Sequence, residues 1–107
     1  MTRPAAPLSG SQRQLTLTVN GGRYATDGQH VREVIRRPRL TRVPHGPPAL
    51  IGVCNLRGTV LPVVSLARLM GIEPGPEQRV AVLDQGGAIG LLVDAVLTLD
   101  ADADTQP

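Results

Sequence analysis

Few side chains in this sequence have the type and spacing that catalysis or metal binding requires. The two histidines, His30 and His45, stand in loop-like segments, with no cysteine or carboxylate beside them at metal-ligand spacing. Ser65 has neither a nearby base nor the surroundings of a nucleophile elbow, so a helix cap is the favoured role. The sequence therefore predicts no enzyme activity, no metal site and no cofactor.

Two other residues interrupt apolar stretches. Cys54 is the only cysteine, so it forms no internal disulfide, and its neighbours predict a buried, unreactive thiol in a reducing cytoplasm. Asp94 has no second carboxylate at a defined spacing. A structural role in a turn or a hydrogen bond is therefore expected for Asp94.

Arg57 is the charged residue best placed for recognition. The pair Arg57-Gly58 separates two apolar runs, residues 50–56 and 59–64, and the glycine indicates a tight turn between two strands. A rigid hairpin would then hold the guanidinium in place while leaving it accessible to another protein. In the alternative reading, Arg57 only closes the hairpin by bonding backbone carbonyls.

The surrounding elements read mainly as strands. Residues 14–20 alternate at period two, and the turn signal Asn20-Gly21-Gly22 joins them to a second strand at 23–25. Residues 79–83 and 88–97 indicate another hairpin, whose second strand is apolar on both faces. The exception is a short helix over 65–70, which Ser65 caps and Gly71 ends.

Three segments are less regular. Val31, Val34 and Ile35 have helix-like spacing and predict a single helical turn that enters a strand, which Pro38 would stop. Residues 40–43 look extended, and residues 73–77, rich in Pro and Gly, predict a surface linker between two lobes.

Composition limits the fold and the location. A chain of 107 residues with Tyr24 as its only aromatic residue must build one small domain on an aliphatic core, which suits β-structure. It contains no apolar run long enough for a signal peptide or a membrane span, so a cytoplasmic location is expected. We expect a disordered leader at 1–12, a domain at 13–99 and a flexible acidic tail at 100–107.

Charge gives one competing hypothesis. The net charge is +2, every basic residue is arginine, and five arginines fall between Arg32 and Arg42. Such a cluster can attract phosphate, so one alternative is a small β-barrel that binds nucleic acid. Because aromatic side chains for base stacking are missing, a solvated face is favoured and no nucleic-acid partner is expected.

Five motifs, in order, resemble the CheW-like domain of bacterial chemotaxis. The resemblance covers roughly residues 14–98, and its motifs lie at 31–35, 40–44, 51–58, 61–66 and 90–96. It implies a pair of small SH3-like β-barrels with one short helix. It also implies a non-enzymatic adaptor that couples the cytoplasmic tips of chemoreceptors to the regulatory domain of the chemotaxis histidine kinase, recruited to membrane arrays through these partners.

The resemblance also assigns partner-binding residues. It carries Arg57 and the adjacent Gly58 onto the family's conserved arginine motif, near the groove between the barrels, and Glu33 onto a neighbouring polar contact. Val31 and Val34 are carried over as apolar contacts, although core packing would explain these two valines equally well. An exposed Arg–Glu pair adds only about 0–1 kcal/mol to stability, which favours a role in specificity.

The chain is about 40 residues shorter than the resemblance leads us to expect. We therefore predict one barrel plus an incomplete second one, with unpaired strand edges near residues 79–97 that favour self-association. A shortened remnant of a coupling protein without independent function is a further alternative.

Overall fold

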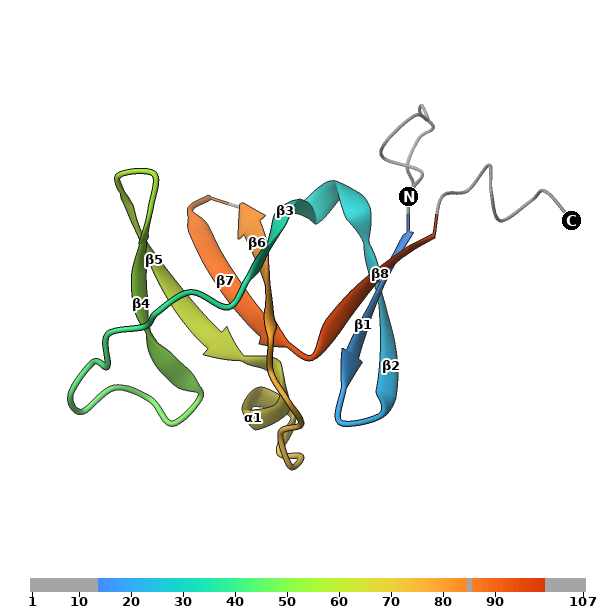
Figure 1. The fold of residues 1–107 in the computed structure, drawn as a ribbon, viewed down its shortest axis with the longest axis horizontal. Coiled ribbons are helices and arrows are strands. Elements are labelled where there is room, and N and C mark those ends of the chain that lie inside the picture. The colour runs from blue at the N-terminus through green and yellow to red at the C-terminus, as the bar shows by residue number, and fades with distance from the viewer. Residues whose placement is uncertain (1–13, 85, 100–107) are drawn as a thin grey trace, which may run out of the picture.

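The computed structural model describes residues 14–84 and 86–99, so the predicted leader and acidic tail lie outside the described residues. Most of the described chain is β-structure (Figure 1). The elements are β1 (Gln14–Val19), β2 (Gly22–Asp27), a 3-10 turn (Gly28–His30), β3 (Val31–Arg36), β4 (Leu50–Leu56), β5 (Thr59–Ser65), α1 (Leu66–Met70), β6 (Arg79–Asp84), β7 (Ala88–Val93) and β8 (Ala95–Leu99).

The larger sheet has five strands and closes on itself. Its order is β3-β6-β7-β5-β4, and only the β5–β7 pair is parallel. After β3 the chain crosses to the opposite edge of the sheet, where Thr41 and Val53 of β4 exchange backbone hydrogen bonds of 2.9 and 2.8 Å. This bridge joins the two edges, which gives the barrel expected from the sequence.

The smaller sheet has three strands in the order β2-β1-β8. It therefore combines the first hairpin with the last described strand, whereas all strands from β3 to β7 belong to the barrel (Figure 1). This sheet thus holds the first and the last described strands.

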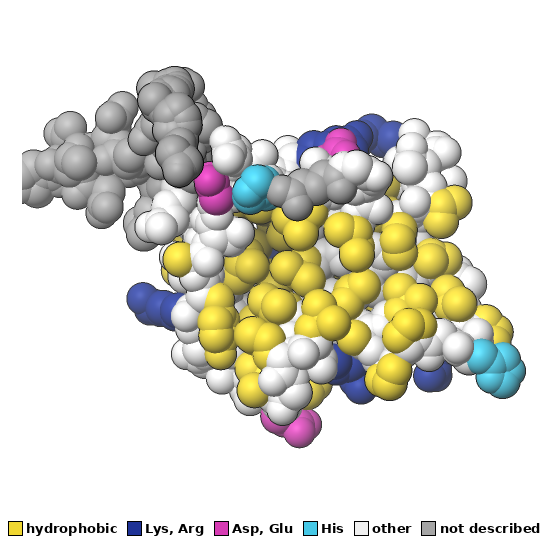
Figure 2. Space-filling view, turned by 180° about the vertical axis from the view of Figure 1, so that it is seen from behind, with side chains coloured by type: hydrophobic (Ala, Val, Ile, Leu, Met, Phe, Trp, Pro, Cys, Tyr) yellow, Lys and Arg dark blue, Asp and Glu magenta, His cyan; other side chains and the backbone are white. Residues whose placement is uncertain are grey.

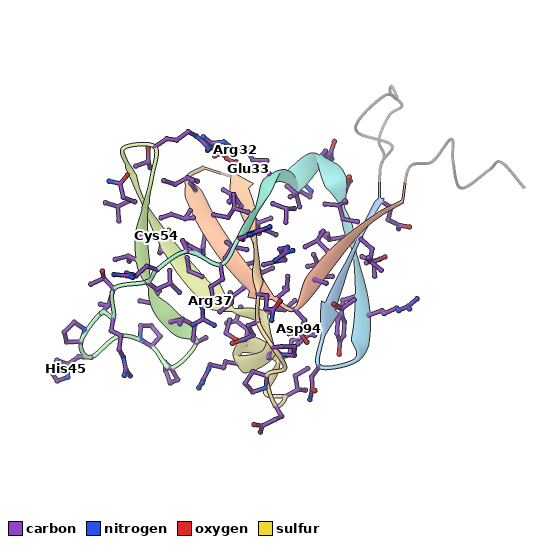
Figure 3. The ribbon with its side chains drawn as sticks, viewed as in Figure 1. Arg32, Glu33, Arg37, His45, Cys54 and Asp94 are labelled. Atoms are coloured by element: carbon purple, nitrogen blue, oxygen red, sulfur yellow. The ribbon has the colours of Figure 1, made fainter. Side chains whose placement is uncertain are left out.

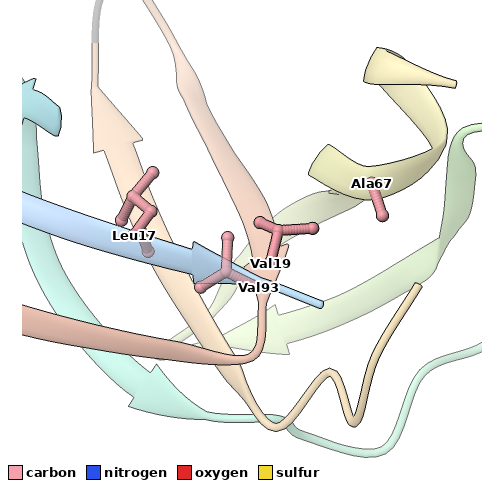
Figure 4. Close-up of a cluster of buried hydrophobic side chains, with 5 residues drawn as sticks. Leu17, Val19, Ala67 and Val93 are labelled. Carbon is pink, nitrogen blue, oxygen red and sulfur yellow. The ribbon is translucent and has the colours of Figure 1, made fainter. Parts of the chain in front are cut away.

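Two apolar clusters stabilise these sheets. The barrel cluster fills the inside of the five-stranded sheet and consists of Leu61, Val63, Val80, Val82 and Leu92. The inter-sheet cluster connects β1, α1, β6 and β7, as Figure 4 shows, and consists of Leu17, Val19, Ala67, Ala81 and Val93. Successive residues of β6 serve different clusters because side chains alternate along a strand. Each fully buried Val or Leu contributes roughly 1.5–3 kcal/mol.

The predicted turns and helix ends are confirmed. Asn20 and Gly21 have φ values of 47° and 86° in the two-residue turn between β1 and β2, as the Asn-Gly signal indicates. The Ser65 hydroxyl oxygen accepts a hydrogen bond from the Arg68 N–H (3.3 Å), and Gly71 ends α1 with a φ of 73°. Ser65 also donates to the carboxylate of Glu77.

The helical turn predicted at residues 31–35 is absent, whereas the strand that it was expected to enter is present. The strand β3 covers this segment, and a bulge shifts its register between Val31 and Glu33. As a result Val31 and Val34 lie opposite Leu83 and Ala81 on the outer face, while Ile35 lies opposite Val80 on the inner face. The three-residue spacing of the valines therefore arises from the bulge. Residues 40–43, which we expected to be extended, form only the isolated bridge at Thr41.

The predicted strand over residues 88–97 is two strands. The chain changes sheets at Asp94, so β7 lies in the barrel and β8 lies in the three-stranded sheet. Residues 73–77 do not separate two lobes, because β6 and β7 return to the sheet that contains β3, β4 and β5. The expectation of unpaired edges at residues 79–97 also fails for β6 and β7, which have neighbours on both sides, while β8 is an edge strand.

Asp94 holds the place where the sheets meet. Its N–H donates to the Thr18 carbonyl (2.9 Å), and its carboxylate accepts a hydrogen bond from the Asn20 N–H (2.7 Å). Gly75 packs against the same carboxylate, because an added Cβ would stand 2.3 Å from Asp94 Oδ2 and 3.1 Å from Asn20 Cα. The structural role expected for Asp94 is confirmed.

This close approach predicts that Gly75→Ala destabilises the protein. The added methyl group must displace backbone or the Asp94 carboxylate, which should lower the free energy of unfolding by about 1–3 kcal/mol in urea. Gly22→Ala is the matched control, since its added Cβ would meet mainly the movable ring of Tyr24. Equal losses for both variants would contradict the tight junction at Asp94.

Candidate functional site

The site begins with the turn that presents Arg57. Arg57 and Gly58 have φ values of 50° and 85° in the two-residue turn between β4 and β5. Asn55 strengthens the turn, because its side-chain oxygen accepts a hydrogen bond from the Gly58 N–H (2.8 Å). The turn fixes the direction in which Arg57 leaves the hairpin.

The guanidinium of Arg57 forms an ion pair with Glu33 of β3, through Nη2 and Oε2. The side chain of Arg57 is 62% exposed and that of Glu33 is 26% exposed. The partner of Arg57 is thus a carboxylate on another strand, whereas the hairpin-closing alternative called for backbone carbonyls. Figure 3 shows Glu33 at the same end of the molecule as the tip of the β4–β5 hairpin.

This ion pair spans the seam of the barrel. The strands β3 and β4 are the two edges of the five-stranded sheet, so the contact joins elements that are neighbours only because the sheet closes. The ion pair with Glu33 restricts the movement of the Arg57 guanidinium, although most of the Arg57 side chain still faces solvent. A restrained, accessible arginine can offer further hydrogen bonds to a carboxylate or carbonyl of another protein.

The remaining predicted contacts divide into two groups. Val34 lies on the outer face of β3 and is 41% exposed, so core packing does not account for it. Val31 packs against the inter-sheet cluster, as the core-packing alternative predicted. The positive φ of Gly58 explains the need for glycine there, since an added Cβ would meet nothing within 4 Å. The structure therefore brings Arg57, Gly58 and Glu33 together, with Val34 beside them on the other face.

Sequence reasoning missed an apolar surface on the outside of the barrel. Val60 of β5 is 66% exposed and Ile89 of β7 is 38% exposed. Figure 2 shows that apolar side chains gather over one broad face of the molecule. The signal was present in the sequence, because β5 has apolar residues at successive positions and only alternate ones can point into the barrel.

The arginine-rich segment does not form one continuous basic face. Arg32 forms an ion pair with Asp84 (3.2 Å), and Arg37 lies toward the other end of the barrel (Figure 3). Arg36, Arg39 and Arg42 are exposed. The segment crosses from β3 to β4, and its charges are distributed along that path.

The reactive groups fit structural roles. The sequence predicts a buried Cys54, whereas the structure shows this residue partly exposed. Its partial burial against the barrel cluster raises the pKa of the thiol, which leaves less of the reactive thiolate. Within residues 14–84 and 86–99, no group of His, Cys, Asp and Glu side chains is arranged to hold a metal ion. No helix in these same ranges is long and apolar enough to cross a membrane.

Comparison with known proteins agrees with these observations. The family model described as "CheW-like domain" matches residues 13–101. The chain is 33% identical over 91 residues to the probable chemotaxis protein CheW of Rhizobium etli, covering 81% of this chain and 59% of that protein. It is 36% identical over 115 residues to the chemotaxis protein CheW of Rhizobium meliloti, covering 100% of this chain and 74% of that protein. The chain thus spans between about half and three quarters of the relatives it matches.

A solved structure has the same fold. The crystal structure of the scaffolding protein TtCheW from Thermoanaerobacter tengcongensis superimposes with a TM-score of 0.74 at 27% identity. The match covers 86% of this chain and 68% of that one. It supports the predicted SH3-like barrel architecture.

The positive φ of Arg57 gives a test of the turn. Arg57→Ala should lower the free energy of unfolding by about 1 kcal/mol more than Arg57→Asn, because asparagine tolerates the left-handed conformation and alanine does not. Both variants lose the same exposed ion pair, so it cancels in the comparison. Urea unfolding of the two variants measures the difference, and identical stabilities would contradict the strained turn.

Proposed function

Because the chain belongs to the family of CheW-like domains, we propose that it is a non-enzymatic adaptor that couples chemoreceptors to a histidine kinase through protein–protein contacts. Its proposed partners are the regulatory domain of the chemotaxis kinase and the cytoplasmic tip of a receptor. These partners would recruit it from the cytoplasm to membrane receptor arrays. The domain that the sequence predicts over residues 13–99 would act as a unit.

The observation that carries this proposal is the ion pair between Arg57 and Glu33. The resemblance to the family assigns partner contacts to both residues. Arg57 is held by a turn and a carboxylate and remains 62% exposed. Since an exposed pair of this kind contributes little to folding, its placement is better explained by partner recognition.

The apolar surfaces support protein partners of the same kind. Val34 is exposed beside Glu33, and Val60 and Ile89 are exposed on the outer face of the barrel. Interfaces between proteins are typically apolar at their centres and charged or polar at their rims. Such a combination occurs around the Arg57 hairpin. The edge strands β2 and β8 also offer positions for a strand of a second copy.

A binding experiment tests this function. We expect the wild-type chain to form a 1:1 complex with the regulatory domain of a chemotaxis histidine kinase, measured by size-exclusion chromatography with light scattering. Arg57→Asn and Glu33→Gln should each weaken the complex about tenfold and leave the melting temperature nearly unchanged, because they remove a charge without disturbing the turn or the core.

Arg23→Gln is the matched control. Arg23 lies on the exposed strand β2, so this substitution removes one positive charge away from the β4–β5 hairpin. A folded wild-type chain that never binds the kinase domain or a receptor tip would refute the adaptor function. Equal binding by wild type and Arg57→Asn would refute the role of the ion pair but leave the adaptor function standing.

A further inference from the structure

A second surface lies at the other end of the barrel from the Arg57–Glu33 pair. It is a hollow of about 720 Å³ between the connector that joins β3 to β4 and the short helix α1. Figure 3 places His45, which lines the hollow, at the lower left, and Glu33 at the top. The two surfaces are therefore separate.

Three arginines from different parts of the chain converge on this hollow. Arg37 follows β3, Arg42 belongs to the connector, and Arg68 belongs to α1. The residues that line the hollow include no aspartate or glutamate. Like charges gather here only because the fold brings these segments together, so the hollow has a positive potential that favours an anion.

None of these three arginines forms an ion pair with a carboxylate in the described part of the protein. Arg37 donates to the main-chain carbonyl of Glu77 (3.3 Å), which carries no net charge. Neither Arg42 nor Arg68 forms an ion pair with any residue in the ranges 14–84 and 86–99. All three side chains belong to exposed residues and can turn toward a ligand.

Part of the connector's backbone cannot donate to a ligand. The N–H groups of Thr41, Gly46 and Leu50 already donate to backbone carbonyls. Pro44, Pro47 and Pro48 have no N–H group. The guanidinium groups are the permanently charged donors that line this hollow, and their paired N–H groups match the two oxygens of a carboxylate.

Apart from His45, the other side chains that line the hollow are apolar. Leu40 and Ile51 extend from the barrel cluster to the hollow, and Val43 is 38% exposed at its side. A volume of about 720 Å³ is much larger than one inorganic anion needs and falls in the usual range for an organic ligand. The ligand should therefore combine negative charge with aliphatic surface.

We propose that this hollow binds an acidic peptide segment of a partner protein, in which carboxylates flank an aliphatic side chain. The aliphatic side chain packs on Leu40, Val43 and Ile51, and the carboxylates accept hydrogen bonds from Arg37, Arg42 and Arg68. This site is independent of the adaptor contacts at Arg57, so the failure of one does not imply the failure of the other.

A titration monitored by NMR tests the site. The probe is the synthetic peptide acetyl-Glu-Leu-Glu-Glu-Leu-amide, added to the ¹⁵N-labelled full chain. We expect shifts confined to residues 37–51 and to α1. Arg42→Gln and Arg68→Gln should each weaken binding about fivefold to tenfold, while Arg23→Gln, which removes a charge far from the hollow, should leave it unchanged.

Four results would overturn the proposal. The first is equal binding of the same peptide with glutamine in place of glutamate, which would mean that charge plays no part. The second is equal weakening by Arg23→Gln, which would indicate only general electrostatic attraction. The third is complete displacement of the peptide by equimolar inorganic phosphate or by a single-stranded oligonucleotide. The fourth is the absence of any shift at millimolar peptide in low salt.

Discussion

The backbone that passes from β7 through Asp94 into β8 determines how the two sheets are arranged. Leu92 lies in the barrel cluster and Val93 lies in the inter-sheet cluster, so two successive residues contribute to different cores. Asp94 then bonds to Thr18 and Asn20 at the first hairpin. Since β8 can pair with β1 only after this change of direction, the three-stranded sheet depends on it.

The closed barrel has a direct consequence for recognition. The bridge between Thr41 and Val53 joins the connector after β3 to β4 through the backbone, and the ion pair between Glu33 and Arg57 joins β3 to the turn after β4 through side chains. The backbone bridge fixes the two edges of the barrel side by side, and this arrangement brings Glu33 within reach of Arg57. A guanidinium held in this way loses less conformational freedom when it binds a partner, which improves affinity without any additional contact.

Local signals in the sequence were sufficient for the turns and for the helix. Asn20-Gly21 and Arg57-Gly58 required positive φ values, and Ser65 and Gly71 marked the ends of α1. These features depend on a few adjacent residues, so propensity alone predicts them. The contact between Arg57 and Glu33 came instead from the family resemblance, and the structure confirms it.

The errors concern features that depend on distant parts of the chain. The bulge at β3 exists because the strand must pair with β6, and its three-residue spacing looked helical without that partner. Likewise, the apolar run at residues 88–97 gave no sign that its two halves join different sheets. The sequence also contained no indication of the hollow lined by Arg37, Arg42 and Arg68, because this hollow exists only when α1 packs near the connector.

The pairing of β1 with β8 also affects how this protein reaches its native state. Gln14 lies opposite Leu99, so the first and the last described strands are neighbours in one sheet. Contacts between such distant residues slow folding, because a long loop must close before they form. During synthesis, β1 and β2 can form their hairpin early, but β1 cannot pair with β8 until the chain has been made as far as residue 99. During that period the second edge of β1 is unpaired, and an unpaired edge can pair with another chain.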